Sequence, residues 1–287
     1  MGLAAVTEDE IRQSIAERGF LSPAIATFPA MYRDMAKGYF DMAEEFSRVG
    51  QTIAIRAMNA APDDHRDPIV MATVLLLRTL QSFQGAMVLC ERGIATEARM
   101  VMRSCFENSF CLAAMIDDTP KLMEAFASDE QHTQKALAKF ISQSDDRMLH
   151  LDARAKKAIR TAASNADQVW GKVKQLSIDE IAKKSAYADS YLMYRTLSAD
   201  ASHPSHRSLD RFFDRKGGEL WDFTLGPQPT EIIAETLNYG CLALSAVLVA
   251  FTQFVDDKEG NRDAAHMLAA YARVLDYINA QQASAGR

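Results

Sequence analysis

Apolar residues recur at helical spacing along most of this chain, and short polar turns separate the segments that carry the pattern. We predict an all-α fold, a multi-helix bundle in which four long apolar helices form the core. The predicted core helices are 30–60, 68–92, 96–117 and 230–255. Helices over 7–18 and 261–282 are expected to pack on a core of about 30–255, so that residues 1–287 form a single helical domain.

The second and third core helices are joined only by the residues GIA, which begin at Gly93. A connection this short predicts an antiparallel helical hairpin. Both helices are apolar nearly all round, so we expect the hairpin at the centre of the fold.

Helix-capping residues predict the shorter elements that follow. Thr119-Pro120 indicates a new helix start, and Ser177 with Glu180 forms a capping box. The shorter helices are expected over 120–128, 130–143, 152–166 and 178–201.

The pattern changes between Ser208 and Pro227, where Gly217-Gly218 is flanked by short runs that carry aromatic residues. This arrangement fits a small β-hairpin excursion near 208–227. An ordered excursion on the bundle surface without strands is the alternative that the sequence leaves open.

Charge and cysteine usage narrow the class of protein. The net charge is −6 and the pI is near 5.6, which argues against broad binding to nucleic acid or anionic membrane. Nucleic acid remains a partner only through a local basic patch, and basic residues do cluster between Lys135 and Lys184. All four cysteines lie in apolar helical patterns without a C-x-x-C pair, so we interpret them as reduced core residues.

The chain carries no pattern that predicts a membrane partner. Its first residues lack a basic segment followed by an apolar one, so they do not resemble a signal peptide. The longest apolar run, near 241–254, is shorter than the roughly 20 residues that span a bilayer. We expect a cytoplasmic protein.

Arg103 and Glu107 stand one turn apart in an otherwise apolar helix, and therefore on the same face of it. Arg78 lies on the facing helix of the predicted hairpin, where it could meet Glu107 or Asn108. Charged residues are rarely fully buried unless they are paired. Three interpretations stay open: solvated faces that never meet, a buried structural network, or a working site.

A second group of polar residues lies near the end of the predicted helix 178–201. Tyr194 and Ser198 share one face, Arg195 lies between them, and His203 follows before a proline. Histidine is suited to proton transfer near neutral pH, although a simple helix end with His203 bonded to backbone is the alternative. Glu-x-x-His, His-Glu-x-x-His and phosphate-loop motifs are absent, so we predict no metal and no cofactor.

These two groups carry a family resemblance. The run 75–107, with Arg78, the Gly93 turn and the sequence RSCFE, together with Tyr194, Ser198 and His203, resembles the bacterial family named domain of unknown function 5677. The resemblance covers roughly 35–255 and implies a helical fold, but it supplies no reaction.

A more distant likeness is to the HEPN helical bundles, many of which are metal-independent ribonucleases or toxins. Those proteins pair an arginine with a histidine a few residues later, whereas here seven residues separate Arg195 from His203. The likeness implies that His203 would be the general base for the RNA 2′-hydroxyl, with Arg103 or Arg195 stabilising the phosphorane charge.

The main expectation is a cytosolic bundle whose buried polar site binds a small molecule or a protein partner. The residues expected to line or act in this site are Arg78, Arg103, Glu107, Tyr194, Arg195, Ser198 and His203. The alternatives are a HEPN-like ribonuclease or toxin in stress or phage defence, and a scaffold or oligomerisation module such as a homodimer.

Overall fold

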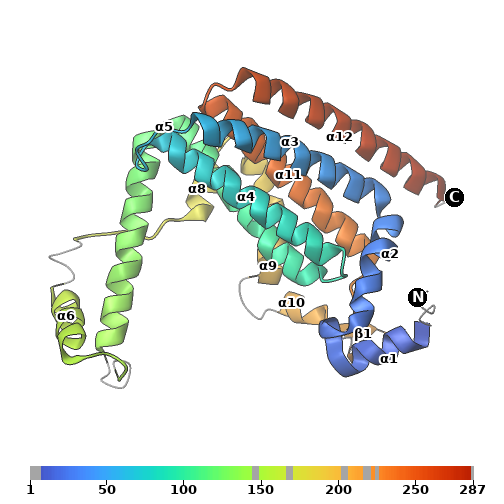
Figure 1. Ribbon diagram of the computed structural model, residues 1–287, viewed down its shortest axis with the longest axis horizontal. Helices are drawn as coiled ribbons and strands as arrows, with labels where there is room; N and C mark the ends of the chain where they lie inside the picture. The colour runs from blue at the N-terminus through green and yellow to red at the C-terminus, as the bar shows by residue number, and fades with distance from the viewer. Residues whose placement is uncertain are drawn as a thin grey trace.

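The bundle core consists of four long helices that pack side by side (Figure 1). They are α3 (Lys37–Ala60), α4 (Pro68–Cys90), the first part of α5 (Ala95–Ser142) and α11 (Thr230–Phe254). This computed structural model describes residues 8–143, 149–165, 171–201, 206–215, 221–223 and 226–285. The prediction of an all-α bundle with a four-helix core is confirmed.

Further helices precede and follow the core. The first elements are α1 (Glu8–Arg18), two 3-10 turns (Gly19–Leu21 and Pro23–Thr27) and α2 (Phe28–Met35). The last helix, α12 (Lys258–Ala285), packs along α3 and α11.

The tight α4–α5 hairpin follows from residues at its two ends. Asp67 caps α4 by accepting a hydrogen bond from the backbone N–H of Ile69 at 2.7 Å, and Pro68 occupies the first turn. Gly93 closes the hairpin with a φ of 73°, a value that glycine adopts without strain. The two helices therefore lie antiparallel, as predicted.

α5 is one long helix with a kink, where the sequence predicted three helices. Asp118 departs from helical geometry (φ −157°, ψ 80°), which agrees with a new start at Thr119-Pro120. The predicted break near residue 129 was wrong. The oxygens of Ser128 and Asp129 do not cap a new helix there, because they accept hydrogen bonds from the backbone N–H groups of Lys174 and Leu176.

The second half of α5 (119–142) and α6 (Ala153–Ser164) pack together and project from the bundle (Figure 1). We call this pair the arm. The chain returns through α8 (Ile178–Lys184), whose predicted N-cap at Ser177 is confirmed by a 3.2 Å bond from the Glu180 N–H to the serine oxygen.

The predicted helix 178–201 is interrupted. After α8 the chain passes through a 3-10 turn (Ala188–Ser190) into α9 (Tyr191–Ala201), which packs against α5. The break occurs because the Ser185 hydroxyl bonds backward to the Ala182 carbonyl and accepts from the Tyr187 N–H, which ends the helix.

A short excursion follows α10 (His206–Asp210). Strands β1 (Phe213–Arg215) and β2 (Trp221–Phe223) pair antiparallel, with Phe213 opposite Phe223. The pairing confirms the predicted hairpin strands, while the Gly217-Gly218 turn lies outside the described residues.

α4 and α11 are long and apolar enough to cross a membrane by length and composition alone, but core helices of soluble proteins meet the same criterion. The most apolar 18-residue stretch is 44% buried in α4 and 56% buried in α11. The fold accounts for this apolarity because both helices belong to the four-helix core.

Candidate functional site

Two arginines one turn apart on α5, Arg99 and Arg103, reach toward α9. Arg99 binds Asp200 near the end of α9, and Arg103 binds Tyr194 near its beginning. The i, i+4 spacing places both guanidinium groups on one face of α5, and the packing of α9 against that face supplies their partners. The charged side chains therefore lie together where α9 packs on α5, and each has a partner that compensates for its burial.

The first group, which we call the closed cluster, consists of Arg99, Asp200, Arg211 and Glu235. Arg99 donates through Nε to the Asp200 carboxylate at 2.6 Å and through Nη1 to Glu235 at 2.7 Å. Arg211 donates to the same aspartate at 2.8 and 3.0 Å. One carboxylate from α9 thus joins α5 to the segment before β1, while Glu235 adds α11.

Burial makes the closed cluster a tightly coupled group of charges. The side chains of Arg99 and Asp200 are both 0% exposed. Burial alone would raise the pKa of Asp200, but hydrogen bonds from Arg211 and Arg99 outweigh it and hold that pKa below its ordinary value. The aspartate is therefore ionised at neutral pH and matches the charge of the buried arginine.

Tyr239 of α11 packs beside the closed cluster. The Tyr239 hydroxyl donates to Glu235 at 3.0 Å, and the Arg99 guanidinium lies 5.7 Å from the centre of the Tyr239 ring. Glu235 is 40% exposed, so this side of the cluster reaches solvent.

The second group, the open cluster, consists of Arg103, Glu107 and Tyr194. Arg103 and Glu107 form an ion pair at 2.7 Å, and their side chains are 28% and 22% exposed. Arg103 donates to the Tyr194 hydroxyl at 3.2 Å, and that hydroxyl donates to Glu107 at 3.4 Å. The arginine also lies over the tyrosine ring, 5.3 Å from its centre. The pair that the sequence singled out is therefore half-buried.

Each cluster leaves one buried nitrogen of its arginine without a hydrogen-bond partner. They are Nη2 of Arg99 and Nε of Arg103, the two such side-chain atoms in the described part of the chain. A buried donor without a partner costs about 1–3 kcal/mol, so both atoms mark a place where an acceptor would be stabilised.

The α4–α5 hairpin makes polar contacts other than those expected for Arg78. Asn108 donates to the Thr79 hydroxyl at 2.9 Å, and Ser104 donates to the Ser82 hydroxyl at 3.2 Å. Arg78 itself is exposed. The structure thus places Arg78 on the surface of the hairpin and outside both clusters.

The candidate site residues on α9 also differ in their surroundings. Tyr194 joins Arg103 and Glu107, while the Ser198 hydroxyl donates to the Tyr194 backbone carbonyl at 2.7 Å and is occupied by its own helix. Arg195 points to solvent. His203 lies outside the described residues, so its expected role as general base stays a prediction.

Sequence reasoning missed the closed cluster. Arg99 precedes Arg103 by one turn in the same apolar helix, and that spacing was the signal that could have identified it. Its partners Asp200 and Glu235 lie 101 and 136 residues away along the chain, and no local pattern relates them to Arg99.

The possible metal ligands and the cysteines of the described residues offer little reactivity. Within the described ranges, no three His, Cys, Asp or Glu side chains are grouped so as to hold a metal ion. The four cysteines are free and buried, and desolvation raises the pKa of the Cys105 thiol to about 12. A thiol with such a pKa stays protonated near pH 7 and is a poor nucleophile.

Comparison with known proteins gives the family of this chain. No curated protein and no solved structure gave a match. A family model described as a family of unknown function, DUF5677, matches residues 70–220. The matched region contains the whole open cluster and all of the closed cluster except Glu235. Because the match covers more than half of the chain, this protein belongs to the DUF5677 family.

Proposed function

We propose that this protein is a cytosolic binding protein whose open cluster takes up a small polar molecule. The observation that carries the proposal is a buried guanidinium nitrogen without a partner in the open cluster, Nε of Arg103. An acceptor oxygen of a ligand would satisfy it and would remove its desolvation cost.

The balance of charge indicates the class of ligand. The two clusters contain three arginines and three carboxylates at the α5–α9–α11 junction. A balanced site has no surplus charge to attract a strong anion or cation. It favours a neutral molecule with carbonyl or hydroxyl oxygens, held by directional hydrogen bonds.

We expect a ligand to approach at the exposed edge of the open cluster. Arg103 and Glu107 are each about a quarter exposed, whereas Arg99 and Asp200 are fully enclosed. The Tyr194 ring packs edge-on against Phe110 at 5.8 Å, which fixes one wall. A ligand would therefore contact Arg103 first. The closed cluster would lie deeper in the protein than the ligand.

The test is a thermal-shift screen of amides, sugars, nucleosides and free amino acids. A ligand at a concentration 100-fold above its Kd stabilises the folded state by about 2.7 kcal/mol, which a melting curve detects. We expect the shift to disappear in Arg103→Met and in Arg103→Lys, because lysine keeps the charge but lacks the guanidinium N–H groups. Arg195→Met, a change of an exposed arginine on α9, is the matched control and should keep the shift.

Two results would contradict the proposal. One is a wild-type protein whose melting temperature no compound changes. The other is a shift that survives both Arg103→Lys and Glu107→Ala. If the clusters serve only a scaffold, these variants will lower the melting temperature without any ligand effect.

A metal-independent ribonuclease is the second candidate. The observation that favours it is that Arg99 binds Asp200, which precedes the expected general base His203 by three residues in the sequence. Expression in bacteria should then arrest growth, and His203→Ala should relieve the arrest while the control His206→Ala should not. Growth that is normal with the wild-type chain, or arrest that persists in His203→Ala, would exclude this candidate.

A further inference from the structure

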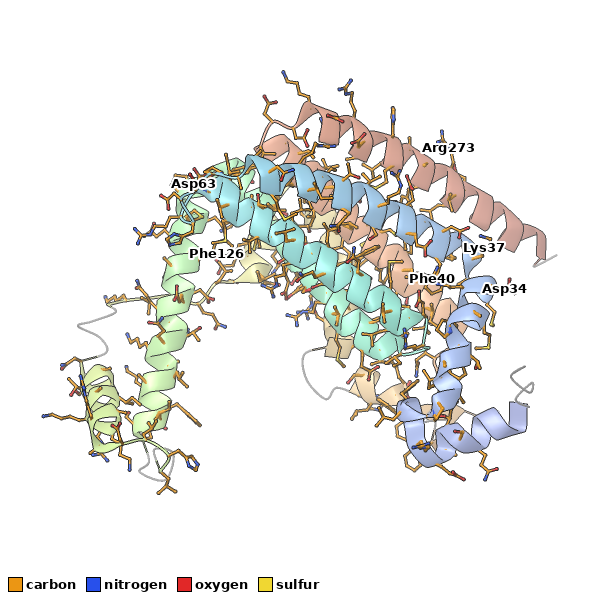
Figure 2. All side chains as sticks on the ribbon, viewed as in Figure 1. Asp34, Lys37, Phe40, Asp63, Phe126 and Arg273 are labelled. Carbon is orange, nitrogen blue, oxygen red and sulfur yellow. The ribbon has the colours of Figure 1, made fainter. Side chains whose placement is uncertain are left out.

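The arm formed by 119–142 of α5 together with α6 extends away from the bundle (Figure 1). Figure 2 shows Phe126 on the arm and Asp63 at the end of the bundle from which the arm leaves. Neither cluster of the candidate site includes a residue of the arm, which therefore needs an explanation of its own.

The arm has almost no core. α6 contains no buried residue, and Leu122 is the one buried residue among 119–142. Leu137 and Phe140 are each 56% exposed, and Leu149, in the connection to α6, is 66% exposed. Exposed apolar side chains that gather on one projection are typical of a surface that binds another protein.

The arm is also basic in an acidic protein. α6 carries Arg154, Lys156, Lys157 and Arg160 and no acidic residue. The two segments of the arm, 119–142 and 153–164, together hold seven basic and three acidic residues, while the whole chain has a net charge of −6. Arg154 and Lys157 are exposed. A partner of the arm should therefore be acidic.

The opposite charge lies on the bundle itself. Asp63, Asp64, Asp117 and Asp118 are all exposed, two in the α3–α4 connection and two at the α5 kink. The antiparallel α4–α5 hairpin brings the kink to the end of the bundle where α4 starts. We call these four aspartates the acidic end.

We propose that the arm of one copy docks on the acidic end of a second copy, and reciprocally, to form a twofold dimer. A second copy supplies the complementary charge without any other partner, and the same contact is made twice, as closed symmetry requires. Exposed leucines such as Leu137 and Leu149 fit a protein interface better than a nucleic acid, which is bound through phosphate contacts.

The test reverses each surface separately. The arm variant is Arg154→Glu with Lys157→Glu. The acidic-end variant is Asp63→Lys with Asp117→Lys, because Asp64 and Asp118 cap backbone N–H groups and should stay. Light scattering coupled to size-exclusion chromatography measures the molar mass against that of the 31.8 kDa chain.

We expect the wild-type chain to be a dimer at about 0.1 M salt and to dissociate at about 1 M, where the Debye length is only about 3 Å. Each double variant should be a monomer, because like charges then face each other in both contacts. An equimolar mixture of the two double variants should recover the dimer, and so should the chain that carries all four changes. Arg18→Glu with Arg273→Glu changes the net charge by the same amount as the arm variant, elsewhere on the surface, and should leave the dimer intact.

A monomeric wild-type chain, or a dimer that neither reversal weakens, would overturn the proposal. A wild-type monomer that binds an oligonucleotide, and loses that binding in the arm variant, would also overturn it and would assign the arm to nucleic acid. Failure of the dimer test leaves the small-molecule proposal unaffected, because the two rest on different residues.

Discussion

Arg99 and Arg103 are chemically identical and lie one turn apart, yet their surroundings give them different roles. The Arg99 side chain is fully buried between two carboxylates, so its charge is a condition of the fold. The Arg103 side chain is 28% exposed, and its ion pair with Glu107 reaches solvent. Burial, and not residue type, separates Arg99 from Arg103, the arginine proposed to bind a ligand.

Asp200→Asn tests the supporting role. The substitution keeps the shape of the side chain but removes the charge that Arg99 and Arg211 face. Breaking a buried ion pair by removing one partner costs about 3–5 kcal/mol, and we expect a loss of that size in the free energy of unfolding. Urea denaturation measures it. Asp189→Asn, which changes an exposed aspartate before α9, should stay within about 0.5 kcal/mol of wild type.

The comparison of wild type with Asp200→Asn also predicts how stability depends on pH. The folded-state pKa of Asp200 is lowered, because the hydrogen bonds from Arg211 and Arg99 outweigh desolvation. Its contribution to stability is therefore complete above the unfolded pKa of about 3.9 and is lost as the pH falls from there through the folded pKa. We expect the stability gap between wild type and Asp200→Asn to be constant near neutral pH and to shrink in acid. A gap that widens in acid would contradict the assigned charge state.

The elements of this fold were predictable where local patterns decide them. Apolar periodicity and the short connection at Gly93 identified the core helices, because local geometry and burial agree there. The misplaced break near residue 129 shows the limit. Ser128 and Asp129 look like capping residues in sequence but bind the distant segment 174–176. The closed cluster was missed for the same reason, since its partners meet only after α9 and α11 have packed.

Two glycines at the α4–α5 hairpin should respond to alanine in opposite directions. At Gly93, φ is 73° and a Cβ would lie 2.5 Å from the Cβ of Pro227. Backbone strain and overpacking together should destabilise Gly93→Ala by roughly 2–5 kcal/mol. Gly85 lies inside α4 with open space around the added Cβ, so Gly85→Ala should stabilise by about 0.5–1 kcal/mol. Thermal melts of the two variants check the signs, and equal effects would show that the tight connection does not constrain the hairpin.

At the scale of the whole molecule, charged residues and buried side chains are distributed unevenly between the bundle and the arm. The bundle holds the core and most of the acidic charge, whereas the arm holds the basic cluster and contains few buried side chains. Composition alone revealed the basic cluster between Lys135 and Lys184. It could not reveal that the basic residues of α6 stand on a projection, because the kink at Asp118 directs the second half of α5 and is a feature of tertiary structure.

Hydrogen exchange should expose this division directly. α6 has 12 residues and none is buried, and isolated helices of that length are marginal in water, so its amides should exchange through low-energy local opening. α11 is buried along most of its length and should exchange only on global unfolding. If arms dock between copies, protection of α6 will rise with protein concentration in wild type but not in the Arg154→Glu, Lys157→Glu variant. Exchange in α6 as slow as in α11 at every dilution would instead mean that the arm is stabilised within one chain. A concentration dependence shared by both proteins would mean that the basic face of α6 does not make the contact.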